Sequence, residues 1–524
     1  MLKKKILEPT IEWPQNLSTY LGQKGYTILK SDLSIKHQMA LKELLTVKPC
    51  MPGSPVQLQK SFPAYRESDK KMYVPRYLGQ DLFGPAKEVK ITEGQNTSIE
   101  FEGVLRDYQV PVAAKFLDHV KLGGGGLLEL PCGWGKTGTA LYLCAQLKKK
   151  TLVIVHKEFL MNQWIERIQQ FIPTAKVGKI QGQVIDIDGK DIVIAMLQSL
   201  SMKDYPSSLF DSFGLTIIDE VHHISSEVFS CALFKLVTKY MLGLSATMNR
   251  KDGTTKVFKM FLGEVVYKVE RSKDEEVVVR GITYKTNDEE YNELALDFRG
   301  QTASSTMLSK ICNYNRRSEF IIKVLKDMLL ENPKQQIMLI ASYRNILDYM
   351  YEAINHHNIC TVGYYVGGMK ESALKKSESK QVVLATFSMA AEGLDIKSLT
   401  TLFMITPMTN IEQAVGRILR QKHEFPAVVV DIIDTHDNFQ RQWAKRKSFY
   451  KKNNYKIIQT SSPTYQPDIS KWTTTYQPTL TCKPTPDSSA PSSSAPDSNS
   501  DSDLEQELIP EEKPIGKCLL KMKK

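Results

Sequence analysis

The sequence predicts an α/β protein with two tandem parallel-sheet domains, an N-terminal accessory domain before them and a disordered C-terminal tail after them. Three observations predict this organisation. The chain has 524 residues, more than one ordinary core organises, so two or three domains are expected. Two blocks alternate short apolar runs with helical patterns, as βαβ units do. The final segment is rich in Ser, Pro, Thr and Asp.

The N-terminal region, residues 1–100, has no clear hydrophobic period. It contains Pro and Gly punctuation, several lysines and aromatic pieces such as "FPAYRESDKKMYVPRYLG". We interpret it as a small accessory domain of undetermined fold. The apolar segment after the first lysines is too short for a secretory signal, and no run of eighteen apolar residues predicts a membrane span. The eight cysteines are scattered singly, which indicates a reducing compartment and no structural metal.

Residues 101–270 make up the first α/β block. Its apolar runs "GLLELP", "TLVIVH", "DIVIAM", "LTIIDE" and "MLGLSAT" are typical of strands buried on both faces. Residues 271–310 are polar and charged, which favours a linker or a strand-rich brace. Residues 311–460 repeat the alternation with "QQIMLIA", "TVGYYVG", "QVVLATF", "TLFMITP" and "AVVVDII". From 461 to 524 the composition predicts disorder, because too little apolar surface is available to fold.

The net charge of +11 is unevenly distributed. The tail from Ser461 holds nine acidic and seven basic residues, a net of −2, so the preceding body carries +13. The positive charge therefore belongs to the part that we expect to fold. A basic folded body makes a polyanionic partner plausible.

The stretch "LPCGWGKT" follows an apolar run and precedes helical sequence. This is the context of a phosphate-binding loop, in which backbone N–H groups and a helix N-terminus face an anion. Lys136 would reach the β and γ phosphates, and the Thr137 hydroxyl would bind Mg²⁺. The alternative is an apolar strand followed by an accidental Gly-Lys-Thr. The candidate nucleotide contacts of this loop are Leu130, Pro131, Cys132, Gly133, Trp134, Gly135, Lys136 and Thr137.

A second motif, "LTIIDEVHH", places Asp219 and Glu220 at the C-terminal end of an apolar strand, which is the ligand-binding edge of an open α/β sheet. Asp219 would hold the magnesium shell, and Glu220 would orient and deprotonate a water. A solvated acidic pair is the alternative. His222 and His223 do not predict a metal site, because adjacent residues rarely converge on one ion.

A third motif, "QAVGRILR", lies in the second block. On a helix, Gln413, Gly416, Arg417 and Arg420 share one face. Two arginines beside a glycine suit a finger that reaches a triphosphate across a domain cleft. A basic surface helix is the alternative.

Together, "VLRDYQ", "PCGWGKT", "IAMLQSL", "DEVH", "LGLSAT", "ATFSMAAEGLDI" and "QAVGRILR" occur in an order that resembles superfamily 2 helicases of the DExH type, over about residues 100–455. The set "PCGWGKT", "DEVHHISSEVF" and "LGLSATMNRKDG" is similar to the XPB and phage UvsW branch. The second half looks like helicases of large eukaryotic DNA viruses, including the poxvirus transcript-release helicase. The resemblance implies two RecA-like domains, ATP and Mg²⁺ in the cleft between them, and movement along DNA or RNA.

The resemblance also implies roles for individual residues. Arg106 and Gln109 would recognise adenine, and Gly393 and Asp395 would line the cleft near ribose. Gln413, Arg417 and Arg420 would complete the γ-phosphate site. The residues that would couple hydrolysis to movement are His222, Ser245, Ala246 and Thr247. The candidate nucleic-acid contacts are His156, Lys157, Gln198, Ser199, Ser342, Arg344 and Thr386.

The segment "RQWAKRKSFYKKNNYK" has two interpretations. Its basic residues and aromatics could bind phosphates and stack on bases, or the aromatics could pack inward with the lysines in solvent. Whether the substrate is DNA or RNA, and whether strands are separated, is open at this stage; a duplex translocase and a nucleotide-gated binding module are the alternatives. Transcription or replication machinery would bind residues 1–100 or the tail. A viral origin would imply the host cytoplasm, with packaging in the virion as an option.

Overall fold

The computed structural model describes residues 11–49, 61–131, 133–223, 226–248, 253–269, 276–392, 396–421 and 423–478. Among the predicted site residues, Cys132, Gly393 and Asp395 lie outside the described residues. The predicted disordered tail lies outside them from residue 479 onward.

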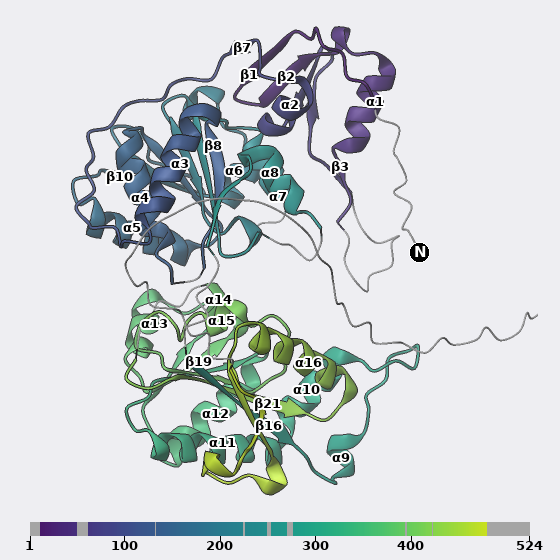
Figure 1. Ribbon diagram of the computed structural model, residues 1–524, viewed down its shortest axis with the longest axis vertical. Helices are drawn as coiled ribbons and strands as arrows, with labels where there is room; N and C mark the ends of the chain where they lie inside the picture. Colours follow the sequence, from purple (N-terminus) through teal and green to yellow (C-terminus); the bar gives the residue numbers. More distant parts are fainter. Residues whose placement is uncertain are drawn as a thin grey trace, which may run out of the picture. The chain divides into compact units, whose positions relative to one another are not determined.

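The N-terminal region forms a mixed five-stranded sheet in the order β5-β6-β2-β1-β7. Of these strands, β1, β2 and β7 are labelled in Figure 1. Its strands are β1 (Thr19–Gly22), β2 (Gly25–Leu29), β5 (Arg66–Glu67), β6 (Lys71–Val74) and β7 (Glu88–Val89), with a separate pair β3 (Thr46–Val47) and β4 (Phe62–Pro63). Its helices are α1 (Ile35–Leu44) and α2 (Arg76–Phe83). The buried Arg76 guanidinium donates to the backbone oxygens of Thr238 and Lys239, both at 3.1 Å, and so ties this region to the first α/β domain.

The first α/β domain is built on an eight-stranded sheet in the order β11-β10-β12-β9-β13-β14-β8-β15. All neighbours are parallel except β10 and β11. The strands are β8 (Gly125–Glu129), β9 (Thr151–Val155), β10 (Val177–Gln181), β11 (Val184–Ile185), β12 (Ile192–Met196), β13 (Leu215–Ile218), β14 (Tyr240–Ser245) and β15 (Val265–Lys268). The helices are α3 (Val110–Gly123), α4 (Lys136–Leu147), α5 (Glu158–Phe171), α6 (Leu197–Met202), α7 (Ser226–Leu233) and α8 (Thr255–Leu262).

This sheet is buried on both faces, as the continuous apolar runs predict. Alternate residues of one strand join different cores: Val153 packs with α3, α4 and α5, whereas Ile154 packs with α6, α7 and α8. Two helical layers therefore leave the carboxyl edge of the sheet as the place where polar side chains collect.

The second α/β domain has an eight-stranded sheet in the order β18-β19-β17-β20-β21-β16-β22-β23, parallel apart from β23. The strands are β16 (Val277–Tyr284), β17 (Ile337–Ala341), β18 (Val362–Tyr365), β19 (Val382–Thr386), β20 (Thr401–Met404), β21 (Ala427–Asp434), β22 (Lys456–Ser461) and β23 (Thr473–Tyr476). The helices are α9 (Glu289–Asn292), α10 (Ser304–Asn313), α11 (Asn315–Glu331), α12 (Arg344–His356), α13 (Glu371–Glu378), α14 (Phe387–Glu392), α15 (Glu412–Val415) and α16 (Asp437–Lys452).

The structure divides this domain differently at two predicted boundaries. The segment 271–310, predicted as a linker or a strand-rich brace, contains β16, which lies inside the sheet between β21 and β22. Its run "VVVRGITY" is a strand sequence, but the charged residues before it concealed the signal. The supposed tail also begins too early, because residues 461–478 complete the sheet through β23. Trp472 is buried there among core residues, so a few aromatic anchors outweigh the Ser- and Pro-rich composition.

Arg317 offers a stability test in the second domain. Its side chain is fully buried, and Nε donates to Asp434 Oδ1 at 2.6 Å while Nη2 donates to Asp434 Oδ2 at 2.8 Å. Replacing Arg317 with Met leaves a buried carboxylate without its cation, so the free energy of unfolding should fall by about 3–5 kcal/mol. The neighbouring Arg316 is exposed and pairs with Asp288, so Arg316→Met is the matched control and should change little. Equal denaturant midpoints for the two variants would contradict this assignment.

No helix in the described part of the chain is long and apolar enough to cross a membrane.

Candidate active site

A cleft of about 1000 Å³ collects most of the predicted nucleotide residues. Both α/β domains contribute to its wall. The first domain supplies Arg106, Gln109, Gly133, Gly135, Lys136, Thr137, Asp219 and Glu220, and the second supplies the segment from Tyr365 to Lys370 together with Arg417 and Arg420.

The loop after β8 takes the shape that anion binding requires. Gly133 and Gly135 have φ of +79° and +94°, in the left-handed region that glycine tolerates. A Cβ atom on Gly135 would lie 2.5 Å from Gln109 Nε2, so a side chain there would displace the Gln109 amide in addition to straining the backbone. The helix α4 begins directly at Lys136, which brings its free N–H groups to the cleft.

Three predicted loop contacts lie elsewhere. Leu130 is fully buried in the core, and its N–H donates to Ser245 O at 2.8 Å. The Trp134 ring packs against Tyr108 at 5.1 Å, and neither Trp134 nor Pro131 lines the cleft. Motif matching assigns every position of the loop to the nucleotide; in the structure the side chains of Leu130 and Trp134 pack against the domain core.

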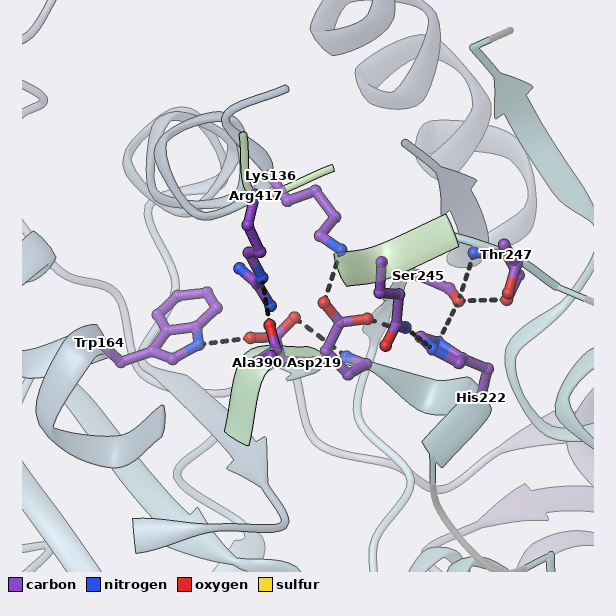
Figure 2. Close-up of polar contacts among 10 residues, drawn as sticks. Lys136, Trp164, Asp219, His222, Ser245, Thr247, Ala390 and Arg417 are labelled. Carbon is purple, nitrogen blue, oxygen red and sulfur yellow. Dashed lines mark hydrogen bonds and ion pairs between the residues drawn. The ribbon is translucent and has the colours of Figure 1, made fainter. Parts of the chain in front are cut away.

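The acidic pair lies opposite the lysine (Figure 2). Lys136 Nζ is 2.6 Å from Glu220 Oε1, and both side chains are less than one-fifth exposed. Asp219 is held by Trp164, whose Nε1–H donates to Oδ2 at 2.9 Å, and by the Glu220 N–H, which donates to Oδ1 at 3.0 Å. Burial raises the pKa of the Asp219 carboxyl, and the adjacent Glu220 carboxylate raises it further.

Glu220 adopts φ of +48°, a strained value for a residue with a side chain. It follows β13 at the point where the chain turns into the short 3₁₀ segment Val221–His223. The turn directs the Glu220 carboxylate toward Lys136 (Figure 2). The strained backbone of Glu220 thus belongs to the carboxylate that pairs with Lys136 in the cleft.

A chain of polar contacts links this carboxylate to the second domain. Gln413 Nε2 lies 2.8 Å from His222 Nε2, and His222 Nδ1 lies 2.6 Å from Ser245 Oγ and 3.4 Å from Glu220 Oε2. Ser245 Oγ in turn contacts the backbone of Thr247 (Figure 2). Three of the four residues predicted to couple hydrolysis to movement, His222, Ser245 and Thr247, therefore meet in one network, and Ala246 lies between two of them in the chain. Gln413, which was predicted for the γ-phosphate site, joins this network instead.

The two arginines enter the cleft from the second domain, although not from one helical face. The helix α15 ends at Val415, and the chain continues as turns, with Arg417 N–H donating to Ala414 O at 3.1 Å. The predicted helix over 413–420 is therefore too long. Arg417 Nε donates to Ala390 O at 2.9 Å, and Arg420 lies against Gly133 of the phosphate-binding loop.

Gln109 is bound mainly to the loop. Its Nε2 donates to Trp134 O and Thr139 Oγ1, both at 3.2 Å, and its Oε1 accepts from Arg106 N–H at 2.9 Å. Sequence reasoning missed the aromatic wall beside it. Phe101 and Phe171 stack at 5.3 Å with their planes 15° apart, and both line the cleft. In the sequence, Phe101 could have been noticed only because it lies close to the "VLRDYQ" motif, and Phe171 belongs to no motif.

The candidate nucleic-acid contacts lie outside this cleft, at the carboxyl edges of adjacent strands. In the first domain, β9 and β12 are parallel neighbours; His156 and Lys157 follow the former, and Gln198 and Ser199 follow the latter. Gln198 Nε2 donates to His156 O at 2.9 Å, which joins the two groups. None of the four residues lines the cleft.

The second domain repeats this arrangement. Its strands β17 and β19 are parallel neighbours in a register that pairs Ala341 with Thr386. Ser342 follows β17 directly, and Arg344 opens α12. These candidates too lie outside the cleft wall.

Helix α16 contains most of the segment "RQWAKRKSFYKKNNYK", for which the sequence left two interpretations open. The structure favours the one in which the aromatic side chains pack inward. Trp443 and Tyr450 are buried in the core, and Arg446 pairs with Asp431 at 2.7 Å from a buried position. Its principal aromatics are therefore not available to stack on bases.

The donor set fits a nucleoside triphosphate with one Mg²⁺. Lys136, Arg417 and Arg420 supply positive charge for phosphates, while Asp219 and Thr137 supply oxygen ligands in the same cleft. Among the described residues, no group of three His, Cys, Asp or Glu could hold a metal by itself. Mg²⁺ is typically bound through one or two carboxylates plus substrate phosphates, so the cleft matches that chemistry.

Comparisons with known proteins agree with this geometry. Residues 102–250 match the family described as "Type III restriction enzyme, res subunit", and residues 321–422 match "Helicase conserved C-terminal domain". Protein L396 of Acanthamoeba polyphaga mimivirus, a predicted ATP-dependent RNA helicase, is 34% identical over 454 residues, covering 84% of this chain and 87% of its own. The chain belongs to the superfamily 2 helicases of large DNA viruses.

Other relatives of this helicase support the same assignment. Protein QP509L of African swine fever virus, also a predicted ATP-dependent RNA helicase, is 26% identical over 500 residues, covering 88% of this chain and 97% of its own. A predicted helicase of Invertebrate iridescent virus 6, 161L, is 25% identical and covers 69% of this chain and 85% of its own. The two eight-stranded sheets are thus tandem RecA-like domains, and the protein is an ATP-hydrolysing nucleic-acid helicase.

Proposed function

We propose that this helicase hydrolyses Mg·ATP in the cleft and converts each cycle into movement along one nucleic-acid strand. The observation that carries the proposal is the meeting of Lys136 and Glu220, 2.6 Å apart, in a cleft that Arg417 and Arg420 enter from the other RecA-like domain. A cation for phosphate, a base for water and two arginines for developing charge are the parts that phosphoryl transfer to water needs.

Each residue has a proposed role. Thr137 and Asp219 would hold Mg²⁺, which neutralises charge on the phosphate oxygens when it is bound. The Lys136 ammonium would bind the phosphates and release its ion pair with Glu220. Glu220 would then accept a proton from the attacking water. Arg417 and Arg420 would stabilise charge on the γ-phosphate, and Arg106, Gln109 and the Phe101–Phe171 wall would surround the adenine end.

The network through His222 would report the state of this carboxylate to the second domain. Gln413→Ala removes the contact to His222 Nε2 but leaves Lys136, Glu220 and both arginines in place. We expect the ATPase rate without nucleic acid to change little and its stimulation by nucleic acid to fall about tenfold, because loss of one partly buried hydrogen bond costs about 1–1.5 kcal/mol. Comparing the two rates in one preparation measures this, and equal stimulation in variant and wild type would contradict the coupling role.

We propose that the strand crosses the carboxyl edges of β9, β12, β17 and β19, where it would contact the residues predicted above. The backbone would be the principal target, since phosphate contacts position a chain without reading its sequence. The names of L396 and QP509L make RNA the first substrate to test. The pathway would be viral transcription, including transcript release, or DNA metabolism in the host cytoplasm. Machinery partners would bind the N-terminal domain or the tail, and packaging in the virion would follow from a transcription role.

Steady-state ATP hydrolysis by the purified chain tests the proposal. The rate is measured with single-stranded RNA, single-stranded DNA and duplex DNA, and with no polymer. We expect one polymer to raise the rate many-fold and thereby to identify the track. Absence of hydrolysis above that of Glu220→Gln with every polymer would favour a nucleotide-gated binding module instead, and stimulation by duplex alone would favour a duplex translocase.

A further inference from the structure

The segment between α9 and α10 of the second RecA-like domain exposes three large apolar side chains in succession. Leu294, Leu296 and Phe298 are 50%, 58% and 91% exposed. Leu294 and Leu296 alternate with Ala295, which packs against the core, and Asp297. Phe298 follows in the turn that the Gly300 N–H closes on Asp297 O at 3.0 Å. Three exposed apolar side chains so close together on an ordered segment indicate a surface with a partner.

The segment forms a hydrogen-bonded hairpin. Leu296 and Thr302 form an antiparallel bridge, Ala303 N–H donates to Ala295 O at 2.8 Å, and Asp297 N–H donates to Gln301 O at 2.7 Å. The Asp297 carboxylate accepts two backbone N–H groups across the turn, from Arg299 at 2.8 Å and from Gln301 at 3.0 Å. The turn therefore holds the Phe298 ring at its tip without help from neighbouring side chains of the core.

The base of this hairpin adjoins the proposed track. It leads directly into α10, and Tyr343 Oη donates to Ser305 O at 3.4 Å in the first turn of that helix. Further along, Asn345 Nδ2 donates to Asn313 Oδ1 at 2.6 Å. Tyr343 stands between Ser342 and Arg344, the two strand contacts proposed at the end of β17. The hairpin is thus attached to the part of the domain where a strand would pass.

The chemistry of the tip suits a base pair. An exposed ring offers a π face, and base–aromatic stacking tolerates any sequence. The Arg299 guanidinium lies 4.9 Å from the centroid of the Phe298 ring, so a cation for phosphate accompanies the aromatic surface. The nearby acidic groups are engaged: Asp297 caps the turn, and Glu293 lies 3.5 Å from Lys310.

We propose that the hairpin Leu294–Thr302 separates the two strands of a duplex, with the Phe298 ring stacking on the last base pair ahead of the motor. This inference rests on the proposed strand track. It makes the protein a strand-separating helicase, and it assigns that step to a surface outside the ATP cleft. Movement along a single strand would not require the hairpin.

The test compares Phe298→Ala with wild type on a forked duplex that carries a single-stranded arm, in RNA and in DNA forms. Loss of one stacked ring should slow strand separation about five- to 150-fold. ATP hydrolysis stimulated by single-stranded polymer should stay within about twofold of wild type. Leu330→Ala, which removes another exposed apolar side chain of the same domain, is the matched control and should unwind normally; Phe298→Trp should retain unwinding.

The outcomes separate this inference from the proposed function. Equal unwinding by Phe298→Ala and wild type overturns the hairpin role but leaves the motor intact. A wild type that hydrolyses ATP on a single strand and separates neither duplex form also overturns it. Parallel loss of ATP hydrolysis and unwinding in Phe298→Ala assigns the residue to folding or to the motor and contradicts the proposal. Absence of polymer-stimulated hydrolysis in wild type refutes the track itself.

Discussion

Replacing Glu220 with Gln is expected to abolish measurable ATP turnover while leaving nucleotide binding intact. The carboxylate is held at the cleft by a strained backbone and by Lys136 at 2.6 Å, so it is placed to accept a proton from water. General base catalysis contributes about 10² to 10⁴ in rate, and glutamine cannot accept that proton. The amide of glutamine is nearly isosteric with the carboxyl group, so Lys136 and Asp219 should keep their positions in the cleft.

Single-turnover hydrolysis and equilibrium binding of a fluorescent ATP analogue measure the two effects separately. Glu227→Gln makes a matched control, because Glu227 is exposed on α7 and lies outside the cleft wall. A Glu220→Gln enzyme with more than a few per cent of wild-type turnover would show that another group activates the water. Loss of nucleotide affinity in the same variant would instead assign Glu220 a binding role.

Removing Arg420 should have an effect of comparable size by a different route. Arg420 belongs to the second RecA-like domain but lies against Gly133 of the phosphate-binding loop, and Arg417 lines the same cleft from a buried position. Arginine fingers in other nucleotide hydrolases contribute about 10³ to 10⁵ to the rate. We therefore expect Arg420→Ala to lower kcat by about that factor, with a much smaller change in the affinity for ATP.

The comparison of Arg420→Ala with Arg441→Ala isolates the effect of position from that of charge. Arg441 is exposed on α16 in the same domain and does not line the cleft. The two variants lose the same charge, so a difference in kcat measures proximity to the phosphate. Equal kcat values would place Arg420 outside the reacting complex. Arg420→Lys should recover little, because lysine lacks the planar fork of donors.

Most of the residues predicted for the nucleotide site line one cleft, because strand ends carry chemistry in α/β sheets. Lys136 and Glu220 each follow an apolar strand, and parallel strands bring their carboxyl ends to one edge. The order of the motifs along the chain further predicted that the second domain contributes residues to the same site. No comparable rule reveals that the Gln109 amide is bound to the loop, because that contact depends on the packing of α3.

The misplaced elements have physical reasons too. Strand β16 (Val277–Tyr284) directly follows a highly charged run, so a window average over both hides it. The segment 461–478 is anchored by the buried Trp472 and the partly buried Tyr465, two residues whose signal is lost in a composition rich in Ser, Pro and Thr. Helix α15 stops at Val415, where turns replace the helix; periodicity favoured a longer helix because Gln413, Gly416, Arg417 and Arg420 fit its spacing. The Phe298 hairpin was invisible, since exposure of an apolar residue is a property of the folded chain.

The most direct test of the central claim is ATP-driven displacement of streptavidin from one end of a biotinylated single strand, followed over time. If the two RecA-like domains form a motor, wild type should displace it from one end only, and the family resemblance predicts the 5′ end, for movement from 3′ to 5′. Glu220→Gln should displace none. Displacement that proceeds equally in Glu220→Gln, or without ATP, would contradict movement powered by hydrolysis in this cleft.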